Sequence, residues 1–461
     1  MDYSSLKPEP TRGNGQSMIM SSGLGLALEP GDERVASRGS EPPASELASK
    51  GLVAGKIADL RHYDVLGIER VVAICCWGRS GSYLLASLLD GHDDVITLPL
   101  SLGELIYPFW EKHQHLSLRE KLLAYPAFVE DMRYDATFFR GQFRIDESDY
   151  HAAVAAALAV YGDQPPQVLE SRANFFRFLV VCYSLAVGRR PAHPRPLIVH
   201  QQHIWSNRNA RRLVSDFPHG RFIHTVRDPI SCVDSTVQHF ADLNDPKFVA
   251  RQYDPAYLRR PRYNYPAWNA FWALAWRDAF HAGLQDRSII VRFEDLHTRP
   301  MQTMGRVARW LNLAEGRVLL ESTFNGKPWI VESGGKTWTG ARPEQVPRRS
   351  RNMSWVDRTV AFALFQENFA RWDYPYPRFF AHRWARALCL PLALVAPMRS
   401  EFVSDRTVLR SLLLPALRSA NLRVAAGTVW QLLVARVGLR ALIFAELCRR
   451  VAVGKRLAKP I

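Results

Sequence analysis

Residues 71–91 show a sharp change of hydrophobic pattern within a short stretch. A run of β-branched residues and cysteines, Val71–Cys76, ends in a polar turn of Gly, Arg and Ser at 78–82. Apolar residues then recur four apart, Leu84 with Leu88 among them, until Asp90-Gly91, which is typical of a helix end. The pattern predicts a buried strand, a tight turn and a helix.

Similar short apolar runs predict further strands along the chain. They lie at Val95–Leu98, Leu197–Val199, Phe222–Val226 and the beginning of Ser288–Leu296. Apolar residues at helical spacing follow the run at Phe222–Val226 and the run that begins at Ser288, which predicts a helix after each. Residues 101–190 are also predicted to be rich in helix, because apolar residues have helical spacing in Leu116–Met132 and alanines dominate Ala152–Val160.

The two ends of the chain differ from its centre. Residues 1–70 are rich in Ser, Gly, Pro and Glu and predict a disordered leader, with neither a secretory signal nor an N-terminal membrane anchor. Residues 381–461 place leucines among arginines and predict basic amphipathic helices. Two interpretations of these helices are equally favoured: contact with an anionic membrane surface, or packing on the rest of the chain or on a second subunit.

Charge and cysteine content narrow the classes of function. The chain of 461 residues has a net charge of +16, and residues 381–461 hold fourteen of its basic residues but three acidic ones. A charge excess that lies mostly at one end of the chain is a poor reason to expect a nucleic-acid partner. The six cysteines lack metal-ligand spacing, so we expect buried free thiols, a reducing compartment and no bound metal.

The turn at 78–82 has the features of an anion site. Unpaired amides at a helix start attract negative charge, Gly81 lets a ligand approach the backbone, Ser80 and Ser82 supply hydroxyls and Arg79 a guanidinium. No lysine follows Gly81, unlike in the G-x-x-x-x-G-K-[ST] loop, which disfavours an ATP-dependent kinase.

A second anion site is predicted after the strand at 222–226. Asp228 can cap a helix and Pro229 suits its first position, so Arg227 ends the strand while Ser235 lies two turns into the helix. Both side chains can reach one phosphate.

Together these motifs resemble those of sulfotransferases that use 3′-phosphoadenosine 5′-phosphosulfate (PAPS), in particular the carbohydrate, tyrosyl-protein and bacterial branches. Arg79-Ser80-Gly81-Ser82 resembles their 5′-phosphosulfate loop, and Arg227-Asp228-Pro229 with Ser235 their 3′-phosphate motif; LLDGHDDVITLP and SIIVRFEDL also agree. The resemblance covers roughly residues 70–380. It implies an α/β, P-loop-like three-layer fold with a central, mainly parallel sheet at 71–380. The helical extension predicted at 381–461 lies beyond the resemblance.

The resemblance also implies roles for individual residues. PAPS would be the sulfuryl donor and PAP the product; Arg79 would stabilise the leaving phosphate, and Ser80, Gly81 and Ser82 would bind the 5′-phosphate. Tyr83 stands where many relatives have Thr or Ser, and is a further candidate for binding the nucleotide, because its phenol can donate a hydrogen bond from a different place. A loop over the nucleotide would add the basic side chains of Lys336, Arg348 and Arg349, unless this is simply a solvated basic loop.

The resemblance leaves the identity of the general base undecided, because one branch of the family uses a histidine and another a glutamate. Glu104, which follows the second strand, ranks first, and His203 at the end of the strand beginning at Leu197 ranks second, with His200 as a further choice. The expected reaction is sulfuryl transfer to a hydroxyl, or an amine, of a carbohydrate or glycolipid, in the cytoplasm or at the inner face of a membrane. The alternative is a non-catalytic membrane-surface protein that retains the nucleotide site; the sequence predicts no oligomeric state.

Overall fold

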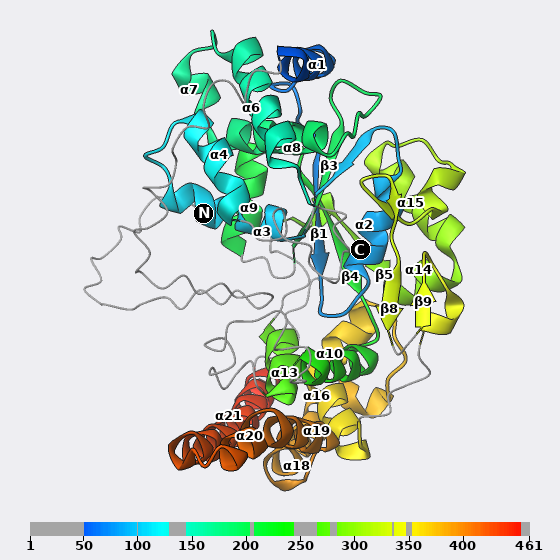
Figure 1. Ribbon diagram of the computed structural model, residues 1–461. Helices are drawn as coiled ribbons and strands as arrows, with labels where there is room; N and C mark the ends of the chain where they lie inside the picture. The colour runs from blue at the N-terminus through cyan, green and yellow to red at the C-terminus, as the bar shows by residue number, and fades with distance from the viewer. Residues whose placement is uncertain are drawn as a thin grey trace, which may run out of the picture. The chain divides into compact units, whose positions relative to one another are not determined.

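The centre of the protein is a five-stranded parallel sheet (Figure 1). The structure is a computed structural model, and it describes residues 50–98, 100–128, 144–202, 207–243, 265–276, 284–333, 336–346 and 353–452. The strand order is β2-β3-β1-β4-β5. The strands are β1 (Val71–Cys76), β2 (Val95–Thr97), β3 (Leu197–Gln202), β4 (Arg221–Val226) and β5 (Ser288–Arg292). All five strand predictions are confirmed. β5 occupies the first five residues of the stretch Ser288–Leu296 in which a strand was predicted.

The register of β1 determines where the site can form. β1 pairs with β3 on one side and with β4 on the other, and Cys76 at its end lies opposite Thr225 of β4. Because all the strands are parallel, their carboxyl ends meet at one edge of the sheet. The chain fills the β3 side first and then crosses to β4, which is the arrangement that opens a ligand crevice at this edge.

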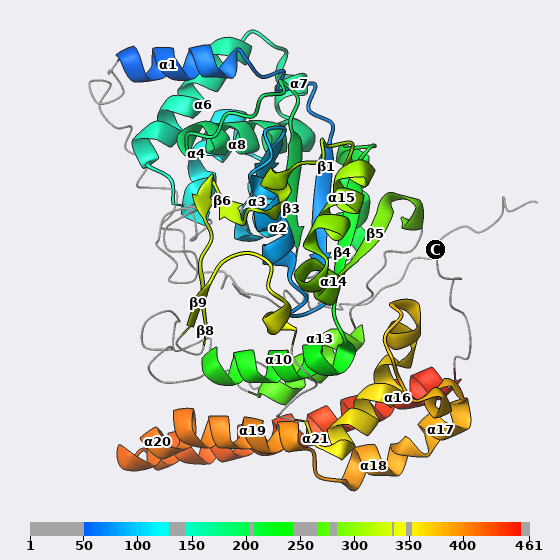
Figure 2. The ribbon, with the colours of Figure 1, turned by 90° about the vertical axis from the view of Figure 1, so that its right-hand side faces the viewer.

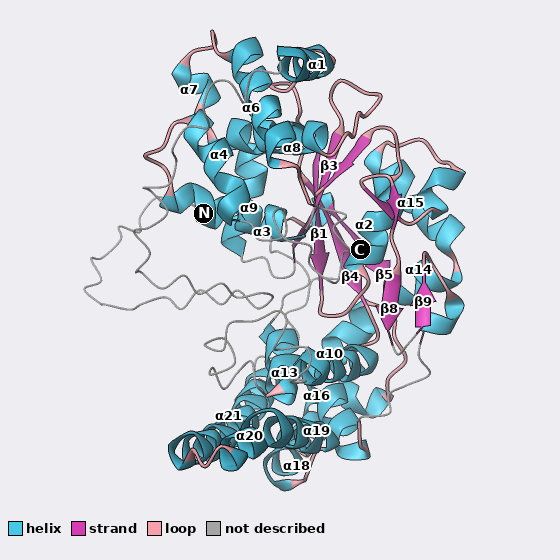
Figure 3. Cartoon of the chain, in the orientation of Figure 1, coloured by secondary structure: helices cyan, strands magenta, loops and turns pink. Residues whose placement is uncertain are grey.

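Alternate residues of β1 enter two different cores, so the sheet is the middle of three layers (Figure 3). Val71 and Ala73 join one core with the helices of residues 100–186, and Val72 and Ile74 join the other with α2 and α15. The first group comprises α3 (Leu100–Lys112), α4 (Leu118–Phe128), α6 (Glu147–Tyr161), α7 (Pro166–Leu169) and α8 (Arg172–Ala186), and the second α2 (Ser82–Asp90) and α15 (Pro300–Leu311). The predicted three-layer α/β fold is confirmed.

Smaller elements complete the α/β part of the chain. Helix α9 (Asn207–Asp216) precedes β4, and α14 (Phe293–Thr298) follows β5 directly. The remaining elements are η3 (Gln285–Arg287), η4 (Arg317–Leu320), η5 (Pro343–Gln345), and the hairpins β6 (Thr323–Phe324) with β7 (Lys327–Pro328) and β8 (Val331–Ser333) with β9 (Lys336–Trp338).

The ordered chain begins earlier than the sequence predicts. Helix α1 (Lys50–Leu60) lies inside the segment expected to be a disordered leader, and after it Tyr63, Val65 and Ile68 are buried in the core that covers one face of the sheet. The prediction is therefore wrong over residues 50–70, because these few apolar residues find partners such as Tyr161, which are distant in the sequence. Residues 1–49 lie outside the described part of the chain.

A third core joins the C-terminal helices to the helices that follow β4 (Figure 2). Its members come chiefly from α10 (Pro229–Leu243), α13 (Pro266–Trp276), α16 (Trp355–Arg371), η6 (Arg378–Ala381), α18 (Cys389–Val395), α19 (Arg399–Val408) and α21 (Leu422–Ala452). The remaining elements pack against α21: α17 (Arg383–Ala387), η7 (Leu409–Leu413) and α20 (Leu414–Arg418). Buried leucines such as Leu439 and Leu447 belong to this core. The helical C-terminal region is confirmed, and one of its faces packs on the rest of the chain.

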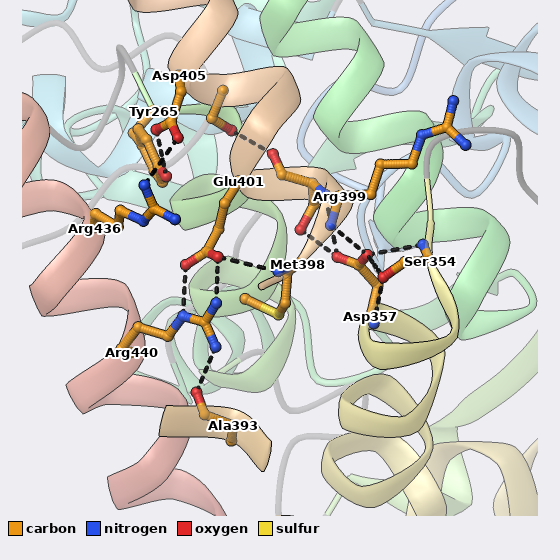
Figure 4. Close-up of polar contacts among 12 residues, drawn as sticks. Tyr265, Ser354, Asp357, Ala393, Met398, Arg399, Glu401, Asp405, Arg436 and Arg440 are labelled. Carbon is orange, nitrogen blue, oxygen red and sulfur yellow. Dashed lines mark hydrogen bonds and ion pairs between the residues drawn. The ribbon is translucent and has the colours of Figure 1, made fainter. Parts of the chain in front are cut away.

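Polar contacts fasten α19 to its neighbours (Figure 4). The carboxylate of Asp357, which is fully buried, accepts hydrogen bonds from Ser354 at the start of α16 and from the amides of Arg399 and Ser400 at the start of α19. Arg440 of α21 forms a two-pronged ion pair with Glu401 of α19. The starts of α16 and α19 thus share one carboxylate.

Candidate nucleotide and sulfuryl-transfer site

The turn between β1 and α2 strongly favours glycine at two positions. Gly78 has φ 69° and Gly81 has φ 85°, both in the left-handed region. A Cβ atom on Gly81 would lie 2.7 Å from Cδ2 of Phe293, and one on Gly78 would lie 2.6 Å from Sγ of Cys232. The backbone therefore passes directly against neighbouring side chains, as the glycine-rich pattern predicts.

Helix α2 begins immediately after this turn and presents its first amides at the carboxyl edge of the sheet. Gly81 is its N-cap and provides no side chain to pair with them. Amides at such a position carry partial positive charge and accept an anion readily. Ser82, the first residue of the helix, is buried next to them.

Ser80 makes a structural contact within the turn. Its hydroxyl is buried and lies 2.9 Å from Oγ1 of Thr225 in β4, and its amide donates to the carbonyl of Gly78. In the described structure Ser80 therefore fastens the turn to the neighbouring strand. Its binding of a phosphate stays a prediction.

Arg227, at the end of β4, is a buried cation beside this turn. It is 7% exposed, its Nη1 donates to the carbonyl of Arg79 at 3.1 Å, and its guanidinium lies 4.3 Å from the ring centre of Phe293. Within the part of the chain that the structure describes, no carboxylate pairs with it, and its buried Nε has no hydrogen-bond partner. A buried charge without a counter-charge is costly, so the site is suited to an anion.

The two sequence motifs are thereby brought together. The exposed side chain of Arg79 and the buried one of Arg227 belong to adjacent loops at the same edge, joined by a hydrogen bond. Ser235 is half-buried on α10, two turns beyond Arg227. Tyr83 packs its ring 6.3 Å from that of Trp329, so it contacts the segment after β7.

Helix α14 supplies residues to the site that the sequence does not single out. Phe293 lies against both Gly81 and Arg227. Glu294 accepts from the amide of Asp228 at 3.1 Å and from the hydroxyl of Tyr374, so it holds the loop that carries Arg227. Asp228 in turn caps α10 through the amide of Ser231, as predicted. The Phe-Glu-Asp-Leu run after the β5 strand is the signal that could have found these residues.

His297, also on α14, connects the site to the segment after β9. Its Nδ1 accepts from the amide of Arg342 at 2.9 Å, and its ring lies 4.4 Å from that of Phe293. Burial, with the charge of Arg227 as a second cause, lowers the pKa of His297 to about 4. The imidazole is therefore neutral at pH 7 and can accept this hydrogen bond. Arg342, which the sequence motifs do not single out, contacts this part of the site through its backbone amide.

Two of the candidate general bases, His200 and Glu104, lie on described elements, but only the surroundings of His200 are described. His200 is buried between Phe176 and Gly103, and burial lowers the pKa of His200 to about 3, so it is a packing residue rather than a base. Glu104 lies on α3, which begins beyond the end of β2 and packs on β3, but its side chain is outside the described part.

Several predicted residues cannot be placed in the site. His203, Arg348 and Arg349 lie outside the described residues. Lys336 begins β9, and its side chain is likewise not described. Their roles remain predictions.

The fold and the site together define an α/β protein with a positively charged site, suited to an anion, at the carboxyl edge of its sheet. The sequence profile of the sulfotransferase family matches residues 72–315, which span the sheet from β1 to β5 and both anion-binding motifs. The chain belongs to the sulfotransferase family. No match was found among curated proteins.

Three solved structures of sulfotransferases are similar to the chain. The sulfotransferase domain of the Synechococcus PCC 7002 olefin synthase is 18% identical over 61% of this chain and 81% of its own, with a TM-score of 0.30. The sulfotransferase domain of the curacin biosynthetic pathway is 19% identical over 67% and 99%, with a TM-score of 0.32. A sulfotransferase of Mycobacterium avium is 14% identical over 72% and 83%, with a TM-score of 0.35.

Proposed function

We propose that the protein transfers a sulfuryl group from PAPS to a hydroxyl of a carbohydrate or glycolipid acceptor. The observation that carries the proposal is Arg227, a buried guanidinium with no carboxylate partner among the described residues, next to a glycine turn and a free helix start. A donor with phosphates at both its 3′ and 5′ positions matches two adjacent cationic positions.

Different residues would bind different parts of the donor. Arg227 and Ser235 would bind the 3′-phosphate, and Gly81, Ser82 and the first amides of α2 the 5′-phosphate. PAPS supplies the sulfuryl group when bound. During transfer the bond from sulfur to the bridging phosphate oxygen breaks while one to the acceptor oxygen forms, and Arg79 would neutralise the charge that develops on the phosphate.

The acceptor proton must leave as the new bond forms. Glu104 is the first candidate to take it, since α3 begins beyond the end of β2, and His203 is the second. His200 is excluded by its burial and by its pKa of about 3.

Transfer from radiolabelled PAPS tests this function. Purified full-length protein is incubated with PAPS and a panel of sugars and glycolipids, and parallel reactions use adenosine 5′-phosphosulfate, which lacks the 3′-phosphate. We expect label on an acceptor hydroxyl from PAPS and much slower transfer from the second donor. Absence of transfer together with absence of PAP binding would contradict the proposal, and equal use of both donors would remove the role given to Arg227.

A further inference from the structure

Helix α21, the last helix that the structure describes, is apolar on the side that faces away from the core as well as on the side that packs. Ala435, Leu439 and Ile443 of α21 are buried against α13 and its neighbours. The opposite stripe is exposed: Trp430 is 68% exposed and Val437 67% exposed. A helix that is hydrophobic all round is normally covered on every side, so this stripe lacks the cover that its composition calls for.

The helices before α21 continue this surface. Helix α19 also packs on α10 and α13 through its buried stripe, and its other side exposes Phe402. We call the exposed apolar residues of this region, together with its unpaired arginines, the basic apolar face. Its large apolar members are Leu388, Leu394, Val395, Phe402, Leu409, Leu414, Leu417, Leu422, Val424, Val429, Trp430, Leu433, Val434 and Val437.

The negative charges of this region are turned inward. Glu401 and Glu446 are buried and paired with arginines, and Asp405 is half-buried between Arg436 and Tyr265 (Figure 4). These are the acidic residues of 381–452, so the described part of the region exposes no unpaired carboxylate.

The positive charges point outward. Six arginines are exposed and make no ion pair with a described residue: Arg383, Arg399, Arg406, Arg410, Arg418 and Arg423. Apolar residues and free cations therefore alternate along the face, for example Phe402, Arg406, Leu409 and Arg410 along α19 and η7.

This combination fits one kind of partner. A second copy of the chain would bring free arginines against free arginines, which disfavours a symmetric contact. A lipid bilayer with anionic headgroups offers an apolar layer for leucine, valine and tryptophan and negative charge for the arginines, in one continuous surface.

The geometry of the C-terminal helices favours a position on the bilayer surface over a helix that crosses the bilayer. Among the described residues, the segment Arg383–Arg418 is long and apolar enough to span a membrane by length and composition. However, the backbone is extended at Ala396 and Met398, between α18 and α19, and Glu401 in α19 is tied to Arg440 of α21. The apolar stretch is thus folded into short helices that lie side by side with α21.

We propose that the basic apolar face of α18–α21 binds the surface of an anionic lipid bilayer. The inference does not depend on the proposed enzymatic function, since it rests on the C-terminal helices alone.

Flotation of the full-length protein with vesicles tests the proposal. Phosphatidylcholine vesicles are compared with vesicles that also contain phosphatidylglycerol, for the native protein, the double variant Trp430→Glu/Val437→Glu and the double variant Arg406→Glu/Arg410→Glu. Met301→Glu, which changes a residue 72% exposed on α15, is the matched control. We expect binding to anionic vesicles only, at least a tenfold loss of affinity in each double variant, and no change in the control.

Other outcomes overturn the proposal. They are failure of the native protein to bind anionic vesicles, equal binding to neutral vesicles, or an equal loss in the Met301 variant. A dimer that dissociates in the Trp430→Glu/Val437→Glu variant, with no vesicle binding, would assign the face to a second copy instead. Circular dichroism and PAP binding, measured on every variant, separate loss of the face from loss of folding or of the nucleotide site.

Discussion

At the scale of single residues, the site depends on charges that the protein leaves uncompensated. Arg227 is buried against the ring of Phe293 and donates to a backbone carbonyl, where most buried arginines would meet a carboxylate. His297, in contact with the same ring, stays neutral because burial and Arg227 both oppose its protonation. The region is therefore prepared for an anion from solution.

The neutral state of His297 predicts a dependence of stability on pH. Its pKa is about 4 in the folded chain and 6.5 as an ordinary value, so the unfolded chain binds the proton first as pH falls. Above pH 6.5 the titration of His297 does not lower the free energy of unfolding. Between pH 6.5 and pH 4 it lowers this free energy progressively, by a total on the order of 3 kcal/mol. Protonation would also end the hydrogen bond from Arg342.

Urea unfolding of the native protein and of His297→Asn from pH 7 to 4.5 measures this effect. The free energy of unfolding should fall more steeply with acidity in the native protein than in the variant. Parallel curves for the two proteins would show that His297 does not contribute.

Residue-level roles divide into those visible in the sequence and those that are not. Arg79, Gly81 and Arg227 stand in motifs whose local chemistry already indicates an anion. Phe293 and Glu294 also stand in a recognisable run, but their contacts in the site are not visible there, since Glu294 acts on Asp228, 66 residues earlier in the chain. Contacts of this kind depend on the register of β4 beside β5, which no local pattern encodes.

At the scale of elements, the turn between β1 and α2 is held by sterics. Gly81 combines a left-handed φ with a neighbour at 2.7 Å, so Gly81→Ala should lower the free energy of unfolding by about 1–3 kcal/mol and weaken PAP binding as the turn shifts. Thermal unfolding and calorimetric titration with PAP measure the two effects.

Gly55→Ala is the matched control for this turn. Gly55 lies within helix α1 and nothing approaches the position of its Cβ, so the same substitution should raise stability by roughly 0.5–1 kcal/mol. Equal effects of the two substitutions would contradict the steric account of the turn.

The shared carboxylate of Asp357 gives a second prediction for elements. Asp357→Ala removes one half of the capping box of α16, whose N-cap is Ser354, and leaves amides at the start of α19 unpaired, so we expect a loss of about 2–4 kcal/mol in the free energy of unfolding. Glu120→Ala, in the exposed capping pair with Ser117, should cost about 0.5–1 kcal/mol in the same urea titration. A cost for Asp357→Ala no larger than this would mean that the shared contact does not fasten the helices.

Elements differ in how far the sequence predicts them. The strands were predictable because β-branched runs ended by turns have a strong local signature, as in Val71–Cys76. Helix α1 was not, because its sequence KGLVAGKIADL has no clear apolar period and its order comes from burial of the residues after it. The two interpretations of the C-terminal helices could not be separated, since α21 presents apolar residues both to the core and to solvent.

At the scale of the whole molecule, one chain combines two surfaces of positive charge with different chemistry. The site at the carboxyl edge of the sheet has few cations, one of them buried, around a tight backbone turn. The basic apolar face has many exposed arginines spread among large apolar side chains. The first suits a small doubly phosphorylated ligand, and the second suits an extended surface.

The central claim is that Arg227 is kept buried and unpaired to bind the 3′-phosphate of the nucleotide. Calorimetric titration of PAP into the native protein, Arg227→Ala and Arg221→Ala tests it most directly. Arg221 begins the same strand, donates to the carbonyl of Trp310 and lies at the opposite end of the sheet. We predict that Arg227→Ala weakens PAP binding by about 2 kcal/mol, roughly 30-fold, and that Arg221→Ala binds as the native protein does. Undiminished affinity in Arg227→Ala would contradict the account.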